Sequence, residues 1–114
     1  MDNVDVLYMR NGMLVSAVRA QVKEIITLKN EVIAFMKGHQ DRFSIDELTT
    51  FNLFEMHLNM VEIDFLELSQ KVERFADEEY MQQTCNVALD GLQQELKAII
   101  PKLRIYKNYV SDDT

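Results

Sequence analysis

The sequence predicts an all-α protein, a single domain built as an elongated antiparallel three-helix bundle. Three observations favour this fold class. First, 114 residues contain only 3 glycines and 1 proline, whereas a β-sandwich needs turn residues about every 8 to 12 positions. Second, 47% of the residues are apolar, which is more than a disordered chain carries. Third, those apolar residues recur three and four positions apart, the spacing of one helix face.

The first helix is expected over residues 13–37. Gly38 follows as a left-handed C-cap, where glycine is favoured because it has no Cβ. Asn11 and Gly12 together are a turn signal. Residues 3–10 are therefore expected to form a short N-terminal segment, either a separate first turn or a frayed extension. The apolar face of the helix consists of Leu14, Val18, Val22, Ile25, Leu28, Val32, Phe35 and Met36.

The second helix is expected over residues 45–75 and has the clearest start signal in the chain. Ser44 and Glu47 have the spacing of a capping box, and Phe43 and Leu48 have that of a hydrophobic staple. The helix then presents a heptad seam, which is typical of long helices that pack nearly antiparallel. The seam consists of Phe51, Phe54, Leu58, Val61, Phe65, Leu68, Val72 and Phe75.

The third helix is expected over residues 77–100. The polar residue Gln82 interrupts the preceding seam, and Asp77 is a suitable N-cap for a new helix. Pro101 lacks a backbone donor and clashes one turn back, so the helix should stop or kink there. A C-terminal arm, extended or a kinked continuation, is expected beyond it. The seam of this helix consists of Cys85, Leu89, Leu92, Leu96 and Ile99.

The net charge of −7 is concentrated in the second helix, since residues 41–79 hold eleven acidic and three basic residues. An acidic chain repels phosphate backbones and anionic lipid headgroups. We therefore expect neither a membrane nor a nucleic acid as partner. The acidic face either attracts a basic partner or is simply solvated. Its members are Glu55, Glu62, Asp64, Glu67 and Glu73.

A possible basic patch lies in the stretch 97–107, which contains four bases and no acid. Four bases can contact a few phosphates at most. Alternatively, they lie against the acidic second helix of the same chain or of a neighbour. The four bases are Lys97, Lys102, Arg104 and Lys107.

A second apolar stripe on the second helix predicts an interaction surface. At 100° per residue the stripe lies almost opposite the seam that begins at Phe51. Three helices usually cover only one broad side of a member helix, so the stripe is left for another chain. Methionine suits such a surface because its thioether is flexible, although it also fills gaps in cores. The stripe consists of Leu53, Met56, Met60 and Ile63.

Catalytic and metal-binding patterns are absent from the sequence. Neither His39 nor His57 has a second ligand three or four positions away, and no zinc-binding or phosphate-loop motif occurs. Glu62 and Asp64 point to different sides of a helix, which argues against a paired-carboxylate site. Cys85 is interpreted as a small buried hydrophobe. We expect no enzyme activity, no cofactor, and no catalytic or metal-ligating residue.

The location of the protein is also predicted by what the sequence lacks. No apolar run is long enough for a secretory signal or a membrane span. The single cysteine cannot form an internal disulfide. We expect an intracellular protein, cytoplasmic or nuclear.

One family resemblance extends roughly over residues 14–83. The run 19–27 (RAQVKEIIT), then Phe35, then a leucine-rich helix ending in 65–73 (FLELSQKVE), then 77–80 (DEEY) resembles the N-terminal Gag-like helical region of BEL/Pao-type LTR retrotransposon polyproteins. The resemblance implies an assembly module that precedes nucleocapsid zinc knuckles and a protease. No zinc-knuckle set and no basic tail are present here. The resemblance therefore implies a fragment or a domesticated remnant, and it carries over no catalytic residue.

The function expected from the sequence is protein association without catalysis. The favoured form is homotypic self-association, as a dimer or higher oligomer, in a Gag-like assembly role. The alternative is a cytosolic adaptor or scaffold domain that binds an amphipathic helix of a different protein. Nucleic-acid binding through the basic patch is a third and less favoured class.

Overall fold

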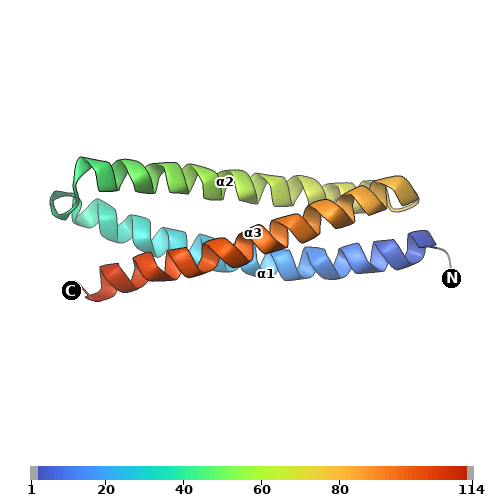
Figure 1. Ribbon diagram of the computed structural model, residues 1–114, viewed down its shortest axis with the longest axis horizontal. Helices are drawn as coiled ribbons and strands as arrows, with labels where there is room; N and C mark the ends of the chain where they lie inside the picture. The colour runs from blue at the N-terminus through green and yellow to red at the C-terminus, as the bar shows by residue number, and fades with distance from the viewer. Residues whose placement is uncertain (1–2, 113–114) are drawn as a thin grey trace.

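The described residues fold into three long helices, as predicted. The structure is a computed structural model that describes the backbone of residues 3–112 and the side chains of residues 3–108. Helix α1 (Asn3–Gly38) leads through a short 3-10 turn, η1 (Gln40–Arg42), into α2 (Ile45–Arg74), and α3 (Glu79–Asp112) follows. Figure 1 shows α2 antiparallel to both α1 and α3, so α1 and α3 run in the same direction. The bundle measures 59 × 21 × 17 Å.

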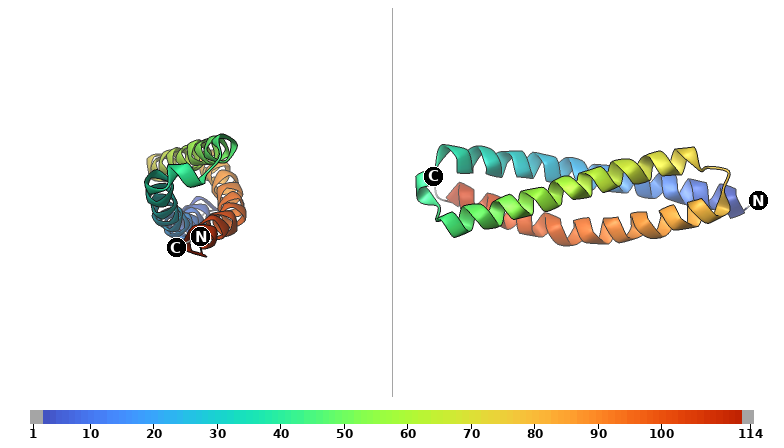
Figure 2. Two further views of the ribbon diagram at one scale, coloured as in Figure 1. Left: turned by 90° about the vertical axis from the view of Figure 1, so that its left-hand side faces the viewer. Right: turned by 90° about the horizontal axis from the view of Figure 1, so that it is seen from above.

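The three helices enclose one core along the whole bundle. Seen from the end, they surround a common axis (Figure 2). The closest backbone approaches between helices join α1 to α3, whereas α2 lies farther from both. Side chains on α2 bridge that larger distance, with Phe51 and Phe65 both buried.

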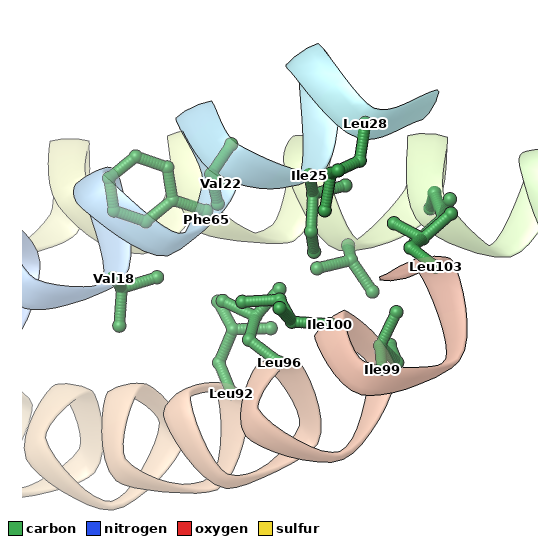
Figure 3. Packing of buried hydrophobic residues seen from close by; sticks show 12 residues of the cluster. Val18, Val22, Ile25, Leu28, Phe65, Leu92, Leu96, Ile99, Ile100 and Leu103 are labelled. Carbon is green, nitrogen blue, oxygen red and sulfur yellow. The ribbon is translucent and has the colours of Figure 1, made fainter. Parts of the chain in front are cut away.

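The core confirms the three predicted seams. Its central cluster joins side chains from all three helices (Figure 3), and a smaller cluster closes each end of the bundle. The central cluster consists of Val18, Val22, Ile25, Leu28, Leu58, Val61, Phe65, Leu92, Leu96, Ile99, Ile100 and Leu103. Burying this apolar surface is the main force that holds the helices together.

The predicted start of α2 is confirmed in both of its parts. The Ser44 hydroxyl accepts a hydrogen bond from the Glu47 backbone N–H at 3.1 Å, and the Ser44 N–H donates to Glu47 Oε1 at 3.3 Å. Phe43 and Leu48 both pack against the end cluster around Phe51. These bonds satisfy backbone donors that a helix N-terminus otherwise leaves free.

Of the two alternatives for residues 3–10, the separate first turn is wrong and the residues extend the first helix, because α1 begins at Asn3 and runs through Gly12 without a break. Asn11 is fully buried, one turn before Leu14 on the same seam. Its amide Nδ2 donates to the backbone oxygen and to the side-chain Oε1 of Gln82, both at 2.8 Å. Asn11 is thus a core residue with a polar partner, and it does not form a turn.

Gln82 explains why α3 begins two residues later than predicted. Its Nε2 donates to the carbonyl oxygens of Val72 and Phe75 at 3.0 and 2.9 Å, at the C-terminal end of α2. The first helical hydrogen bond of α3 runs from the Gln82 N–H to the Glu78 carbonyl. The predicted N-cap Asp77 is therefore wrong, since it lies in the turn. The polar side chain at position 82 completes the end of α2.

The predicted end of the third helix at residue 100 is also wrong, because α3 continues through Pro101 to Asp112. Of the two alternatives for the residues beyond this proline, the extended arm is therefore wrong and a helical continuation is formed; residues 113 and 114 lie outside the described part of the chain. Leu103 is fully buried, and the Tyr106 ring meets the Phe51 and Phe54 rings at centroid distances of 5.8 and 5.9 Å. Proline in a helix interior costs about 3 kcal/mol. The continued burial beyond it offsets that cost.

The predicted left-handed cap at Gly38 is not formed. No described glycine has a positive φ, and Gly38 is the last residue of α1. The chain instead tightens, with the His39 N–H donating to the Met36 carbonyl at 3.3 Å. The His39 ring stacks on Phe35 at 4.2 Å. This turn satisfies end carbonyls of α1 without glycine geometry.

Asn11→Ala should lower the free energy of unfolding by about 1 to 3 kcal/mol, because it leaves the buried Oε1 of Gln82 without its donor. Urea denaturation followed by circular dichroism measures this loss. Asn30→Ala, at an exposed position of the same helix, is the matched control and should change stability by less than about 0.5 kcal/mol. Equal effects of the two changes would contradict the role given to Asn11.

Pro101→Ala should raise the free energy of unfolding by about 1 to 2 kcal/mol. The restored backbone hydrogen bond and relieved clash exceed the loss of proline's restriction of the unfolded chain. Thermal and urea unfolding measure the change, with the exposed neighbour Lys102→Ala as control. A lower stability would mean that the proline ring is required in this helix.

Candidate functional site

The four predicted interaction residues form an exposed stripe on α2, called here the α2 stripe. The exposed fractions of Leu53, Met56, Met60 and Ile63 are 64%, 63%, 56% and 48%. The buried seam of α2 lies on the opposite side of the helix. The stripe therefore faces away from both α1 and α3.

Two polar contacts attach the edges of α2 to the neighbouring helices and leave the α2 stripe between them. On one edge, His57 Nε2 lies 3.0 Å from Glu95 Oε1 of α3. On the other edge, Lys29 Nζ of α1 donates to Asn59 Oδ1 at 2.8 Å. His57 directly follows Met56, and Asn59 directly precedes Met60, so the two contacts lie on either side of the stripe. The contacts therefore define which side of α2 is outermost. Sequence patterns along single helices did not reveal either contact.

Two further exposed apolar residues lie near the stripe. Ile45 and Leu66 are 82% and 51% exposed, at the start of α2 and three residues after Ile63. The sequence analysis missed them because Ile45 marked the helix start and Leu66 follows the seam residue Phe65. Their helical spacing from the stripe was the available signal.

Exposed apolar residues on the other helices form smaller groups. On α1, Val6, Met9 and Met13 share one face near the N-terminal end of the helix. On α3, Tyr80 and Val87 are exposed beside one shallow hollow, and Ile105 is exposed five turns beyond Val87. Among the described side chains, the α2 stripe is the longest continuous apolar face left uncovered.

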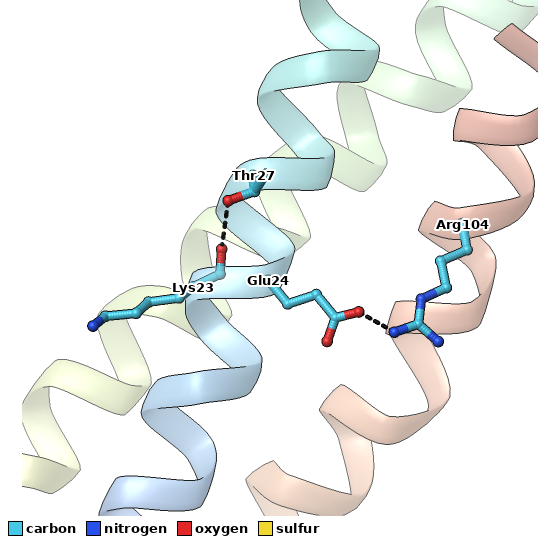
Figure 4. A network of polar contacts seen from close by, with 4 residues as sticks. All are labelled: Lys23, Glu24, Thr27 and Arg104. Atoms are coloured by element: carbon cyan, nitrogen blue, oxygen red, sulfur yellow. Dashed lines mark hydrogen bonds and ion pairs between the residues drawn. The ribbon is translucent and has the colours of Figure 1, made fainter. Parts of the chain in front are cut away.

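The basic patch is partly neutralised by α1. Arg104 forms an ion pair and hydrogen bond with Glu24 (Figure 4), and Lys107 Nζ lies 3.0 Å from Glu31 Oε2. The expectation that these bases lie against the acidic second helix of the same chain is thus wrong for these two, because α3 runs alongside α1 at that end. Lys97 and Lys102 are exposed. Two of the four bases are therefore already engaged with carboxylates of the same chain.

The acidic residues of α2 are divided between its edges. Asp64 and Glu67 line a shallow groove toward α3 with Lys71 and Glu95, whereas Glu55 lines a groove toward α1. Within the described residues, no group of three or more His, Cys, Asp or Glu side chains is placed to hold a metal ion. The acids are spread along the helix instead of converging on one point.

An apolar cavity lies where α1 turns into α2. It has a volume of about 230 Å³ and is lined by Val32, Met36, Phe43 and Tyr106, with Asp46, Glu47 and Thr50 around them. Pockets that hold small molecules usually measure about 300 to 1,000 Å³. This cavity is below that range.

Cys85 is a buried core residue, as predicted. Its side chain is 1% exposed and packs in the end cluster with Val72 and Leu89. Burial raises the pKa of the Cys85 thiol above its ordinary value, and the positive charge of Lys71 opposes this with a smaller effect. The thiol is therefore neutral at physiological pH, whereas a nucleophilic cysteine needs the thiolate form.

Comparison with protein-family models, with curated proteins and with solved structures finds no match for this chain. No helix within residues 3–112 is both long and apolar enough to cross a membrane. The function must therefore be inferred from the exposed side chains, above all from those of the α2 stripe.

Alkylation of Cys85 by iodoacetamide at pH 8 should be at least about tenfold slower in the folded protein than in urea, because the thiol is buried and neutral. Mass spectrometry measures the rate. Because the pKa of the Cys85 thiol is raised in the folded state, the protonated thiol favours the folded state at pH values below the unfolded-state pKa. This contribution to stability is lost as the pH rises through the folded-state pKa. Cys85→Ala should therefore show a smaller loss of stability in alkaline solution. Equal alkylation rates in the two states would contradict this description.

Proposed function

We propose that this chain is a non-enzymatic self-association module that pairs through the α2 stripe. The observation that carries the proposal is the exposure of Leu53, Met56, Met60 and Ile63 along one continuous face. Exposed apolar surface of this extent, bordered by polar residues, is typical of protein-binding sites. Methionine adapts to an opposing surface at low cost because its side chain is flexible.

The energetics favour an association of moderate strength. Full burial of one large apolar side chain contributes about 1.5 to 3 kcal/mol, so four half-exposed side chains on each of two copies would contribute roughly 6 to 12 kcal/mol. Association costs about 4 to 15 kcal/mol in lost translational and rotational freedom. The two ranges overlap, so the stripe alone supports a reversible contact. Further contacts or a higher local concentration would strengthen it.

An assembly role follows if many copies are held close together. The resemblance to the Gag-like region of BEL/Pao-type retrotransposon polyproteins supports this role, because it implies a module that brings polyproteins together. Such a module acts inside the cell and needs no cofactor. Pairing of modest strength becomes effective when several contacts act at once.

Met56→Glu combined with Met60→Glu should abolish self-association, because it puts four carboxylates into each paired interface. Sedimentation of the purified chain at tens of micromolar measures the mass in solution. The matched control is Met9→Glu with Met13→Glu, which has the same spacing and similar exposure on α1 and should leave association unchanged. A strictly monomeric unmodified chain would overturn the proposal.

A monomeric chain would favour the adaptor alternative, in which the α2 stripe accepts an amphipathic helix of another protein. Titration with an apolar-faced helical peptide, followed by fluorescence anisotropy, tests it directly. In that case the Met56→Glu/Met60→Glu variant should lose peptide binding while retaining its helical content.

A further inference from the structure

We propose that a second copy of this chain binds the α2 stripe. The α2 helices of the two copies pack against each other in antiparallel orientation. The two-fold axis that relates the copies lies level with the midpoint between Met56 and Met60. This inference rests on the proposed self-association and specifies its geometry. Three features of α2 support it: the spacing of the stripe, the positions of Asp46 and Lys71, and the position of Glu67.

The spacing of the α2 stripe is the same from either end, with steps of three, four and three residues. In an antiparallel pair, Leu53 of one copy therefore meets Ile63 of the other, and Met56 meets Met60. A two-fold contact requires such self-complementarity, because each residue contact occurs twice. All four apolar side chains find an apolar partner in this register.

Neighbouring registers are less favourable. A shift of one heptad in one direction places Glu67 of one copy opposite Met56 of the other, which would desolvate an unpaired carboxylate. The same shift in the other direction leaves only Leu53 and Met56 in mutual contact, and Ile63 then meets Asp46. The register centred between the methionines avoids both.

Asp46 and Lys71 provide charge complementarity at the two ends of the contact. Lys71 lines the groove that contains Glu95 of α3, together with Asp64. Asp46 stands 18 residues, or five full turns, before Asp64 and so points in the same direction. Both Asp46 and Lys71 therefore lie on the α3 edge of α2. Both side chains are exposed, and neither has a salt-bridge partner among the described residues.

An antiparallel two-fold pair brings like edges of α2 together. In the proposed register Asp46 of one copy then falls beside Lys71 of the other. Symmetry makes this ion pair occur twice, once at each end of the stripe. Opposite charges at such positions select orientation and register more than they add affinity.

A parallel arrangement would be opposed by Glu67. This exposed residue continues the line of the stripe four positions after Ile63. In a parallel pair it would face the same residue of the other copy, and like charges repel. In the antiparallel pair it faces Thr49, a neutral side chain. On the opposite edge of α2 the uncharged amides of Asn52, Asn59 and Gln70 are exposed, while Glu55 of that edge lines the groove toward α1.

Disulfide trapping tests the orientation in the full chain, with Cys85→Ala removing the native thiol. Leu53→Cys and Ile63→Cys chains are prepared with distinguishable masses and oxidised mildly, alone and mixed. The antiparallel pair predicts mixed dimers in at least tenfold excess over dimers of either variant with itself. The control is Val87→Cys on α3, more exposed than either test position but off the stripe, which should trap neither partner.

Charge reversal tests the register independently. Lys71→Glu should weaken the dimer about tenfold, as should Asp46→Lys, and the two changes combined in one chain should restore affinity to within about threefold. Lys97→Glu, an exposed reversal on α3, is the matched control and should have no effect. Sedimentation equilibrium measures the dissociation constants, and circular dichroism shows that each variant stays folded.

The possible outcomes distinguish the antiparallel geometry from the proposed self-association on which it rests. Suppose that the Met56→Glu/Met60→Glu variant loses the dimer, but that Leu53→Cys and Ile63→Cys each form disulfide-linked dimers with themselves. This result would overturn the antiparallel geometry and leave the proposed self-association intact. Reversals that do not rescue one another would overturn the register. An unmodified chain that stays monomeric would remove both proposals.

Discussion

The hydrogen-bonded pair of Asn11 and Gln82 is the constraint on which the arrangement of the three helices depends. Asn11 donates twice to Gln82, and Gln82 donates to two carbonyls at the end of α2, so one buried network joins all three helices. Apolar side chains tolerate small shifts along a helix, whereas a buried amide tolerates few because an unpaired polar group is costly. The network therefore determines how α1 and α3 align.

That alignment has consequences along the whole length of the bundle. With α1 and α3 parallel and close, the seam of α3 remains buried beyond Pro101 as far as Leu103, and Arg104 reaches Glu24. Two of the bases in the 97–107 stretch are thus engaged with α1, which reduces the positive surface available to a polyanion. The same arrangement leaves α2 in contact with other helices on one side only, so its second apolar face remains exposed.

The proposed association through α2 and the acidic character of the chain are compatible, because the charges flank the apolar face and do not interrupt it. Charged residues at the rim of an interface influence orientation and partner choice, while the apolar centre provides most of the affinity. Asp46, Glu67 and Lys71 are placed to act in the first way, and Met56 and Met60 in the second. The interface proposed here needs no basic partner and no bound ligand.

Sequence patterns were sufficient to predict the fold class, the three seams, the capping box at Ser44 and the exposed stripe, because each depends on spacing within one helix. They misassigned Asn11, Gln82 and Pro101, since each resembles a helix boundary in a local pattern. Their roles depend on the tertiary structure: Asn11 donates to Gln82 across helices, and burial on both neighbours outweighs the local cost of Pro101. Ion-pair partners such as Glu24 with Arg104 were likewise decided by helix order in space, which short-range spacing does not encode.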